Sequence, residues 1–446
     1  MVRPLSRFVP MKSHSCDALP QRSSLLRSPG IWKVPGPCFV SCHQFMSSTR
    51  HRVCLVIGTR PEAIKMAPVY AALREHPRLE PLVVATTQHR EMLRQALEVF
   101  GIVPDIDLEL MQNGQHLGSF VSRAMASLTE TFSATQPTYV LVQGDTSTVT
   151  AAALSAFYQG IPVGHVEAGL RSFDLSSPFP EEVNRRIATI TATTHFAPTD
   201  EARRNLLAEG VPREDIVVTG NTVVDALHMV PPRSRFEADT LNAVPWHGRR
   251  IILATVHRRE SQGDHLEAIC RAFEQLVQRF DDVELVFPVH LNPRVREVVT
   301  ARLGGIPRIH LLDPISYPDL LEVIRRCTLI LSDSGGIQEE APSFRKPIQV
   351  LRDTTERPEV VHAGFGLLVG TDTDRIVDST STLLSDPTAY AQRIAGANPF
   401  GDGRAAQRVV EVLDQQVQDG SARRVLRRMD FAQVQTVMAR SASTHA

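Results

Sequence analysis

The sequence predicts an α/β fold of two lobes, each a parallel β-sheet covered by helices. From His51 onward, short apolar runs rich in β-branched residues alternate with stretches whose apolar residues recur at helical spacing. Residues 230–249 interrupt this alternation with prolines and charges, which is typical of a linker or a domain edge. A second alternating series follows. We therefore expect two similar Rossmann-like lobes with the active site in the cleft between them.

The first lobe begins with a predicted strand over VCLVIG (53–58), followed by an Ala- and Leu-rich helix from about Pro61 to His76. A second strand, LVVATT (82–87), precedes another stretch with apolar residues at helical spacing. Further strands are predicted at residues 139–144, 161–166, 194–198 and 215–221. This rhythm is typical of a doubly wound sheet, which we expect to occupy residues 51–229.

The second lobe is expected over residues 230–386 and contains six predicted strands. They lie at residues 251–256, 283–289, 308–313, 328–333, 347–351 and 366–370. The remaining residues, 387–446, are predicted to be a helical segment that partly packs back on the first lobe. Neither lobe has a G-x-G-x-x-G pattern after its first strand, so the sequence predicts no dinucleotide cofactor.

Residues 1–50 differ in composition from the rest of the chain. They contain seven Lys or Arg residues and one acid, with many Ser and Pro residues. This composition is compatible with a transit peptide. The alternative is a start codon placed too early, with Met46 opening a short polar lead into the first strand. We favour the second interpretation, and expect residues 1–45 to be disordered or absent from the native protein.

Bulk composition limits the functional classes. The formal net charge of −1 gives no reason to expect nucleic acid or a membrane as a partner, and no apolar run approaches the ~20 residues that span a bilayer. Six scattered cysteines favour reduced thiols and a cytoplasmic location. Cys38 and Cys42 lie beside His43, but no second ligand pair accompanies them, so we expect no metal.

Three acidic residues occupy positions that favour chemistry. Asp145 follows a predicted strand in VLVQGDTST, Glu167 follows another in VGHVEAGLRS, and Glu181 lies in SSPFPEEVNRR. Ligands of open α/β sheets bind at the carboxyl edge of the strands. Carboxylates that converge there can divide acid and base roles. Asp145, before Thr-Ser-Thr, could instead be a helix N-cap.

A glycine turn in the second lobe resembles an anion site. In SDSGGIQEEAPS, Ser334, Gly335 and Gly336 follow a predicted strand, and backbone N–H groups at such a turn suit a diphosphate. An ordinary glycine-rich turn is the alternative. Of the two acids that follow, Glu339 and Glu340, one could complement the helix dipole and one could accept hydrogen bonds from ribose hydroxyls.

Cationic side chains follow other strands. Arg60 and Lys65, in GTRPEAIKMAPV, could both reach a phosphate, although Lys65 could also be a solvated helix charge. The spacing is not that of a P-loop, which argues against ATP hydrolysis. His257 follows the first strand of the second lobe, and Arg357 lies beyond a later strand.

With these residues assembled, the chain resembles the non-hydrolysing UDP-N-acetylglucosamine 2-epimerases over roughly residues 51–415. The motifs that carry the resemblance are GTRPEAIKMAP, TTQHREML, QGDTST, PVGHVEAGLRS, PFPEEVNRR, TGNTVVDAL, HRRES, PVHLNP, SDSGGIQEEAPS and RDTTERPE. The resemblance implies a glycosyltransferase-B-like fold. It also implies interconversion of UDP-N-acetylglucosamine (UDP-GlcNAc) and UDP-N-acetylmannosamine (UDP-ManNAc) without a redox cofactor, by a homodimer.

The resemblance assigns roles to individual positions. It implies that Asp145, Glu167, Glu181 and His257 are catalytic. The residues that it implies for substrate binding are Arg60, Lys65, Ser334, Gly335, Gly336, Glu340 and Arg357. Gln88, Glu91 and His290 match positions where bacterial members bind a second UDP-GlcNAc as an activator. Two departures are Val256, where the family usually has glycine, and the uracil-facing segment DPISYPDL (313–320).

Chemistry narrows the expected mechanism. The C2 hydrogen of the sugar is not adjacent to a carbonyl, so simple proton abstraction would give a poorly stabilised carbanion. We therefore expect elimination of UDP to 2-acetamidoglucal and re-addition after protonation on the other face. A hydrolysing 2-epimerase that releases ManNAc and UDP, a UDP-sugar glycosyltransferase and a catalytically silent UDP-sugar sensor remain alternatives.

Overall fold

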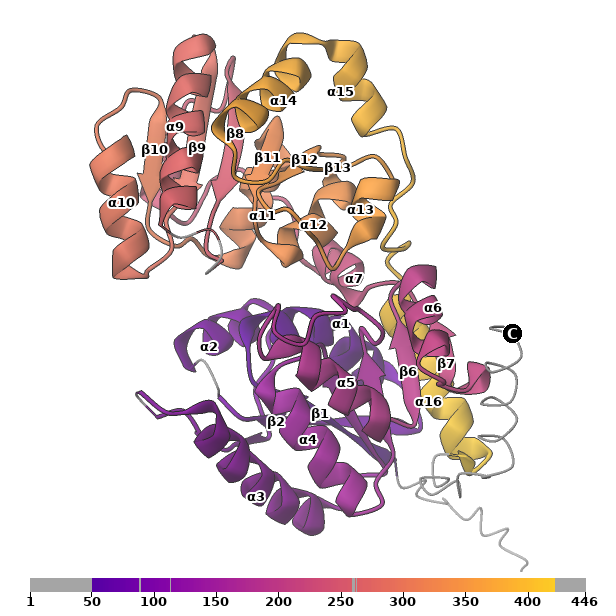
Figure 1. Ribbon diagram of the computed structural model, residues 1–446. Coiled ribbons are helices and arrows are strands. Elements are labelled where there is room, and N and C mark those ends of the chain that lie inside the picture. Colours follow the sequence, from indigo (N-terminus) through magenta and orange to yellow (C-terminus); the bar gives the residue numbers. More distant parts are fainter. Residues whose placement is uncertain (1–49, 88–89, 113, 259–260, 262, 422–446) are drawn as a thin grey trace, which may run out of the picture. The chain divides into compact units, whose positions relative to one another are not determined.

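The computed structural model describes residues 50–421 apart from positions 88, 89, 113, 259, 260 and 262. The N-terminal extension and Gln88, both subjects of expectations above, lie outside the described residues. The described chain contains two parallel sheets, which confirms the predicted fold class (Figure 1).

The first sheet has seven strands in the order β3-β2-β1-β4-β5-β6-β7, all paired in parallel. The strand order reverses direction between β1 and β4, and such switch points are where open α/β sheets bind ligands. The strands are β1 (His51–Ile57), β2 (Leu79–Ala85), β3 (Ile106–Asp107), β4 (Tyr139–Gln143), β5 (Val163–Val166), β6 (Thr194–Ala197) and β7 (Ile216–Val218).

The second sheet repeats this pattern with six strands, in the order β10-β9-β8-β11-β12-β13. Its pairs are again parallel, and its switch point lies between β8 and β11. The strands are β8 (Arg250–Thr255), β9 (Val283–Pro288), β10 (Ile309–Leu312), β11 (Leu329–Ser332), β12 (Ile348–Val350) and β13 (Gly366–Leu368).

Helices cover both faces of each sheet. Those of the first half are α1 (Arg60–Glu75), α2 (Arg90–Val99), α3 (Leu117–Thr135), α4 (Ser147–Tyr158), α5 (Glu181–Thr191), α6 (Asp200–Ala208) and α7 (Thr222–Met229). Those that follow are α8 (Asp239–Asn242), α9 (Asp264–Arg279), α10 (Pro293–Leu303), α11 (Tyr317–Arg326), α12 (Gly335–Glu340), α13 (Pro358–His362), α14 (Thr373–Ser385), α15 (Pro387–Arg393) and α16 (Ala405–Gln418). No helix in the described part of the chain is both long and apolar enough to cross a bilayer.

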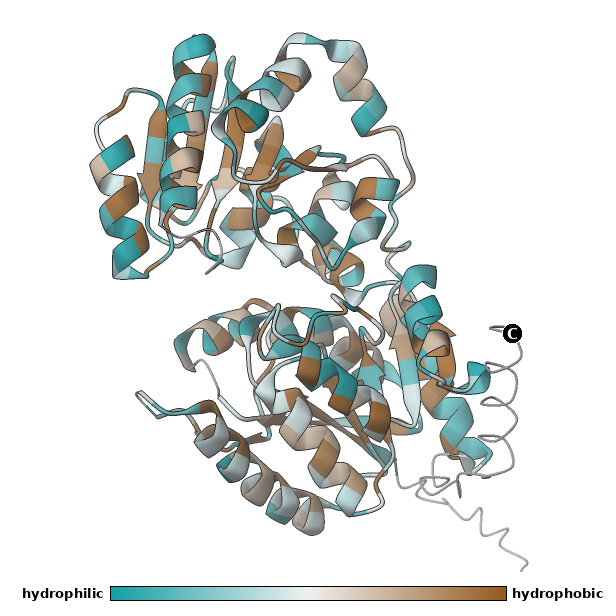
Figure 2. Ribbon diagram, viewed as in Figure 1, coloured by the Kyte–Doolittle hydropathy of each residue, from teal (hydrophilic) through white to brown (hydrophobic). Residues whose placement is uncertain are grey.

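Alternate residues of each central strand enter different cores, because successive side chains of a strand point to opposite faces. In β1, Leu55 and Ile57 pack with α1, α2 and α7, whereas Cys54 and Val56 pack with α3 and α4. Strands buried on both faces read as continuous apolar runs, which is why the sequence pattern revealed them. Figure 2 shows these hydrophobic strands, with hydrophilic residues concentrated on the helices.

The segments that join the two halves are packed against the rest of the chain. Residues 230–249 contain α8, and the Asp319 carboxylate accepts hydrogen bonds from the backbone N–H groups of Glu237 and Ala238, both at 2.9 Å. The last helix, α16, packs against α1 and α7 of the first half. Its first turn is held by Asp225, which accepts from the N–H of Ala406 at 2.9 Å. We propose domain boundaries at 51–229, 230–386 and 387–446.

Candidate active site

Asp145 follows β4 and contacts helix α5. Its carboxylate accepts a hydrogen bond from Arg185, whose other arm donates to the fully buried Glu182 at 3.1 Å. Asn184 fastens the same loop, because its side-chain amide donates to the backbone carbonyl of Asp145 at 2.9 Å. The N-cap of α4 is Thr146, whose hydroxyl accepts from the N–H of Val149. The Asp145 carboxylate is therefore engaged by a cation rather than by a helix end.

Glu181 begins α5, the helix that also supplies Arg185. Partial burial raises the pKa of Glu181, the negative charge of Asp145 raises it further, and the cations Arg258 and Arg185 oppose this effect. The first half of the chain thus places Asp145 and Glu181 within electrostatic reach of each other. Arg258 comes from the loop after β8, so a residue of the second sheet takes part in this cluster.

Glu167 lies where β5 ends, and its backbone adopts a left-handed conformation with φ +66°. Such a conformation costs free energy for a non-glycine residue, and residues of this kind concentrate at functional sites. The Glu167 carboxylate accepts hydrogen bonds from Lys65 and from the side-chain amide of Asn221, the latter at 3.1 Å. Burial raises the pKa of Glu167, and the nearby Glu339 raises it further against the opposing charge of Lys65.

Lys65 is 6% exposed, so the interpretation of this residue as a solvated helix charge is wrong. Its ammonium contacts Glu167 and lies 2.7 Å from Glu339 of α12. Burial acts to lower the pKa of Lys65, but the two carboxylates outweigh it and raise the pKa above its usual value. Lys65 is therefore charged and is shared between two carboxylates from different halves of the chain.

Arg357 completes this cluster from the second half. Its Nε lies 2.5 Å from Glu339, and despite burial the charges of Arg357 and Lys65 keep the pKa of Glu339 below its usual value. A Cβ added to Gly335 would lie 2.6 Å from the Arg357 guanidinium, whereas one added to Gly336 would meet only the Ser334 hydroxyl, at 3.9 Å. Gly335 thus leaves room for the Arg357 guanidinium, and the backbone at Gly336 is open to a bound group.

Arg60 and Glu340 meet at Tyr317. The Tyr317 hydroxyl donates to the Glu340 carboxylate at 3.0 Å, and the Arg60 guanidinium lies over the Tyr317 ring, 5.8 Å from its centroid. Burial raises the pKa of Glu340 to about 7, although the Tyr317 hydrogen bond and Arg60 act to lower it. The structure therefore places Arg60 with Glu340 in a second cluster.

His257 is oriented by Asp333, which the sequence did not single out as a site residue. The ring Nδ1 of His257 lies 2.9 Å from the fully buried Asp333 carboxylate. The same carboxylate accepts from the backbone N–H groups of His257 and Arg258 and from the Ser261 hydroxyl. A carboxylate on Nδ1 fixes the tautomer and leaves Nε2 for a ligand. Val256 is 2% exposed and packs in the core of this half, so its side chain does not enter the cluster.

Two of the predicted activator-binding residues are described. The His290 ring stacks on His257 with 6.3 Å between the ring centroids, so it borders the site. Glu91 is exposed on α2 and pairs with Arg94 at 3.1 Å, and no contact among the described residues joins it to His290.

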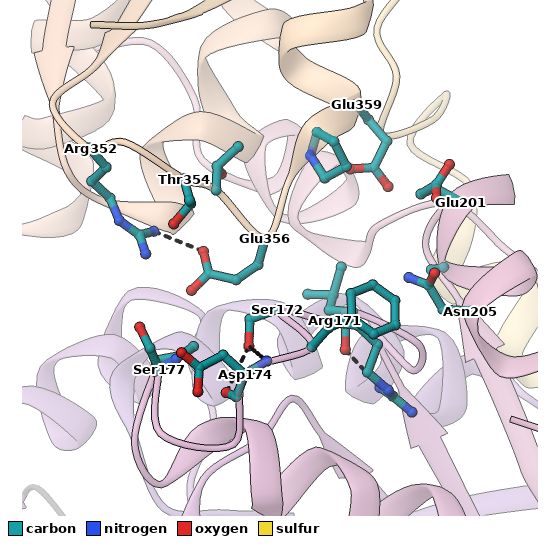
Figure 3. Close-up of a pocket in the computed structure, with 16 residues that line it drawn as sticks. Arg171, Ser172, Asp174, Ser177, Glu201, Asn205, Arg352, Thr354, Glu356 and Glu359 are labelled. Carbon is teal, nitrogen blue, oxygen red and sulfur yellow. Dashed lines mark hydrogen bonds and ion pairs between the residues drawn. The ribbon is translucent and has the colours of Figure 1, made fainter. Parts of the chain in front are cut away.

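A cavity of about 320 Å³ adjoins the charged cluster. Figure 3 shows Arg352 and Glu356, paired at 2.8 Å, facing Ser172 and Asp174. Glu356 precedes Arg357, and the backbone N–H of Ser172 donates to Glu182 at 3.0 Å, so the cavity wall continues into both clusters. None of Asp145, Glu167, Glu181 and His257 lines this cavity.

Several residues of the candidate site were not predicted from the sequence. Arg185, Asp333 and Tyr317 contact predicted site residues directly. The signal for Arg185 was its position four residues after Glu181, which places both near the same face of a helix. Asp333 directly follows a strand of the second sheet in SDSGG, and Asp145 was predicted from the same kind of position after a strand of the first sheet. Tyr317 lies in the segment that departs from the family pattern, and no spacing rule singles it out.

Comparisons with a family model, with curated proteins and with solved structures all match this chain to the same family. The family model described as UDP-N-acetylglucosamine 2-epimerase matches residues 71–414. The UDP-N-acetylglucosamine 2-epimerases of Escherichia coli K12 and Yersinia pestis are each 48% identical to this chain over 368 residues, covering 81% of this chain and 98% of each relative. The crystal structure of UDP-GlcNAc 2-epimerase from Neisseria meningitidis bound to UDP-GlcNAc is similar at 44% identity and TM-score 0.78, covering 82% of this chain and 100% of that chain.

Proposed function

Since the chain belongs to the UDP-N-acetylglucosamine 2-epimerase family, we propose that it interconverts UDP-GlcNAc and UDP-ManNAc reversibly and without net hydrolysis. The observation that carries this proposal is the placement of its carboxylates. Asp145 and Glu181 form one group with Arg185, and Glu167 forms another with Lys65. Inversion at a carbon requires proton transfer on two faces of the sugar, and two separate carboxylate groups can serve two faces.

The proposed reaction is an elimination followed by an addition. The C2–H bond breaks while the bond between C1 and the diphosphate oxygen breaks on the opposite face, giving 2-acetamidoglucal and UDP. The glucal is then protonated at C2 on the other face, and the diphosphate oxygen re-forms its bond to C1. Atoms balance without an external oxidant or reductant. Asp145, Glu167 and Glu181 serve as the proton-transfer groups, each of which typically contributes ~10²–10⁴-fold to such a rate.

The leaving diphosphate needs positive charge. We assign this task to Lys65, Arg60, Arg357 and His257, together with the backbone of Ser334, Gly335 and Gly336. Preorganised cations and N–H groups stabilise the charge that develops on the departing group. Asp333 holds the His257 ring through Nδ1, which leaves Nε2 available to the diphosphate. Glu340 is assigned to the ribose hydroxyls, for which a carboxylate is a suitable acceptor.

The proposal extends to regulation, assembly and location. A second UDP-GlcNAc would bind at Gln88, Glu91 and His290 as an activator, which is supported by the stacking of His290 on His257. A homodimer would use the exposed apolar side chains of α4 and α5, namely Tyr158, Val183 and Ile190. Light scattering of Ile190→Arg tests the dimer, because a charge there would leave a monomer. A cytoplasmic location is supported by the free thiols of Cys54, Cys270 and Cys327.

The experiment that tests the reaction is product identification by proton NMR of the full chain with UDP-GlcNAc in D₂O. The proposal predicts UDP-ManNAc carrying deuterium at C2, with UDP largely esterified. Stoichiometric free ManNAc and UDP would instead identify a hydrolysing enzyme. An unchanged spectrum with UDP still bound would favour a transferase or a sensor.

A further inference from the structure

Glu62 lies buried between the two loops that meet at the switch point of the first sheet. It belongs to the first turn of α1 and is 1% exposed. One carboxylate oxygen accepts from the backbone N–H groups of Gly58 at 2.5 Å and Thr59 at 2.8 Å. The other accepts from the Thr146 hydroxyl. Glu62 therefore bridges the β1–α1 loop to the β4–α4 loop.

These two loops carry different parts of the proposed chemistry. The β1–α1 loop leads directly into Arg60, and the β4–α4 loop contains Asp145. The β1–α1 loop also lies directly against the first turn of α4, since a Cβ added to Gly58 would lie only 2.1 Å from the Thr148 hydroxyl. Of the two, the loop with Asp145 has further anchors: His165 bonds the Gly144 carbonyl at 2.7 Å, and Asn184 holds Asp145 itself. Among these contacts, the hydrogen bond from Thr146 to Glu62 is the one that ties the loop containing Asp145 to the loop preceding Arg60.

We propose that Glu62 is a positioning residue that sets the placement of Asp145 relative to Arg60 and so aligns proton transfer with departure of the diphosphate. The inference rests on the proposed function, because it assigns Glu62 a task within that reaction. Glu62 acts through Thr146 and the β1–α1 backbone and does not touch the substrate. Reacting groups must be held closely, because a misplacement of about 1 Å can cost roughly 10²-fold in rate.

The bridge does not depend on the charge of Glu62. Burial raises the pKa of Glu62 to about 7, while the hydrogen bonds from Thr146, Gly58 and Thr59 act to lower it. A protonated carboxyl keeps the bridge by donating to the Thr146 oxygen, since a hydroxyl can both donate and accept. Glutamine has the same shape and can accept from the two backbone N–H groups while donating to Thr146. Glu62→Gln is therefore the conservative variant that preserves positioning, and Glu62→Ala is the variant that abolishes it.

The test compares Glu62→Gln, Glu62→Ala, Thr146→Ser, Thr146→Val and the Glu62→Ala/Thr146→Val double variant in the full chain. For each, kcat and KM for UDP-GlcNAc, the Kd for UDP and the thermal unfolding temperature are measured. We expect Glu62→Gln and Thr146→Ser to keep kcat within about threefold, whereas Thr146→Val lowers kcat at least about tenfold with a nearly unchanged Kd for UDP. The kcat of the double variant should be no lower than that of Glu62→Ala alone, because both substitutions remove the same hydrogen bond.

A control separates positioning from loss of a helix cap. Thr146 also caps α4, so its removal lowers stability as the loss of any cap does. Asp372→Ala removes the cap of α14 in the other half and should lower the unfolding temperature with kcat unchanged. Wild-type kcat in Thr146→Val, or independent multiplicative losses in the double variant, would overturn the assignment of Glu62 alone. A wild-type chain that forms no UDP-ManNAc would overturn the proposed function and this assignment together.

Discussion

Lys65 of α1 and Glu339 of α12 form a buried ion pair of 2.7 Å between the two halves of the chain. Each member has a second partner: Lys65 contacts Glu167, and Glu339 lies 2.5 Å from Arg357. Lys65 and Arg357, which we assign to the diphosphate, therefore both contact the Glu339 carboxylate. Lys65 also contacts Glu167, which we propose as a proton-transfer group. The cations proposed to hold the diphosphate and the carboxylate proposed to transfer a proton therefore belong to one buried network of ion pairs.

Replacing Lys65 with methionine tests this network. We expect a lower unfolding temperature, because breaking a buried ion pair typically costs about 3–5 kcal/mol, and weaker UDP binding, because a cation is lost. Calorimetry and UDP titration measure both effects. The matched control is Lys346→Met, since Lys346 donates to the Cys327 carbonyl and has no partner described in the cluster. Equal UDP affinity and stability in Lys65→Met and the control would contradict the account.

The proposed proton-transfer groups are tested by isosteric neutral substitutions. Asp145→Asn and Glu167→Gln should each lower kcat by at least about two orders of magnitude, because general acid–base help from one group is typically worth ~10²–10⁴-fold. The Kd for UDP should change little in Asp145→Asn, since this carboxylate pairs with Arg185 and with none of the cations assigned to the diphosphate. Steady-state kinetics and titration check this, with the exposed Asp239→Asn as control. A near-wild-type rate in either variant removes that residue from the mechanism.

Asp333→Asn should impair catalysis through His257. The amide that replaces one carboxylate oxygen cannot accept from all of the N–H and O–H donors that converge on Asp333, so the ring tautomer is no longer fixed. We expect a loss of roughly 10–100-fold in kcat, by analogy with the loss that follows mutation of a carboxylate that orients a metal-ligating histidine. Nitrogen NMR of the histidine ring reports the tautomer directly. An unchanged tautomer with a reduced rate would indicate a different role for Asp333.

The raised pKa of Glu340 predicts a pH dependence of stability. Its pKa is about 7 in the folded chain against 4.5 in the unfolded chain, so between these values the folded state binds more protons. Stability contributed by this group is therefore greatest at low pH and is lost as the pH rises toward 7. Glu340→Gln removes the titration and should flatten this part of the profile of unfolding temperature against pH. Identical profiles for the variant and the wild type would show that Glu340 does not titrate in this range.

UDP binding should show the opposite trend for the same group. The ionised carboxylate can accept hydrogen bonds from two ribose hydroxyls, whereas a protonated one loses part of that capacity. The Glu340 contribution to UDP affinity should therefore increase as the pH rises through 7. The difference in Kd between wild type and Glu340→Gln, measured from pH 6 to 8, isolates this contribution from other titrating groups.

The sequence predicted the fold well because its strands are buried on both faces. Continuous apolar runs such as VCLVIG marked the strands, and helical spacing marked the segments between them. The strand β3 was missed because two residues cannot establish a period. The segment 230–249 was predicted as a linker from its prolines and charges, but Asp319 fastens it to the second half through two backbone hydrogen bonds. That contact lies about 80 residues away in sequence, beyond the reach of local patterns.

The candidate site was predictable where its residues follow strand ends and hidden where it depends on tertiary contacts. Asp145, Glu167 and His257 were visible because each follows an apolar run. Lys65 was ambiguous, because its burial against Glu167 and Glu339 exists only once two distant helices meet. The left-handed backbone of Glu167 could not be predicted from the sequence, since this conformation is common for glycine and uncommon for glutamate. The close contact of Arg357 with Gly335 explains why a glycine occupies this position. The SDSGG motif alone did not reveal this packing.

In the proposed elimination, the bond between C1 and the diphosphate oxygen breaks in the same cycle in which C2 loses its hydrogen. UDP-GlcNAc labelled with ¹⁸O in the C1–O–P bridge, turned over by the full chain in D₂O and followed by phosphorus NMR, tests this directly. We expect the label to move into non-bridging positions of the β-phosphate while C2 gains deuterium. Deuterium at C2 with the label retained in the bridge would show that C2 exchanges without departure of UDP and would contradict the elimination.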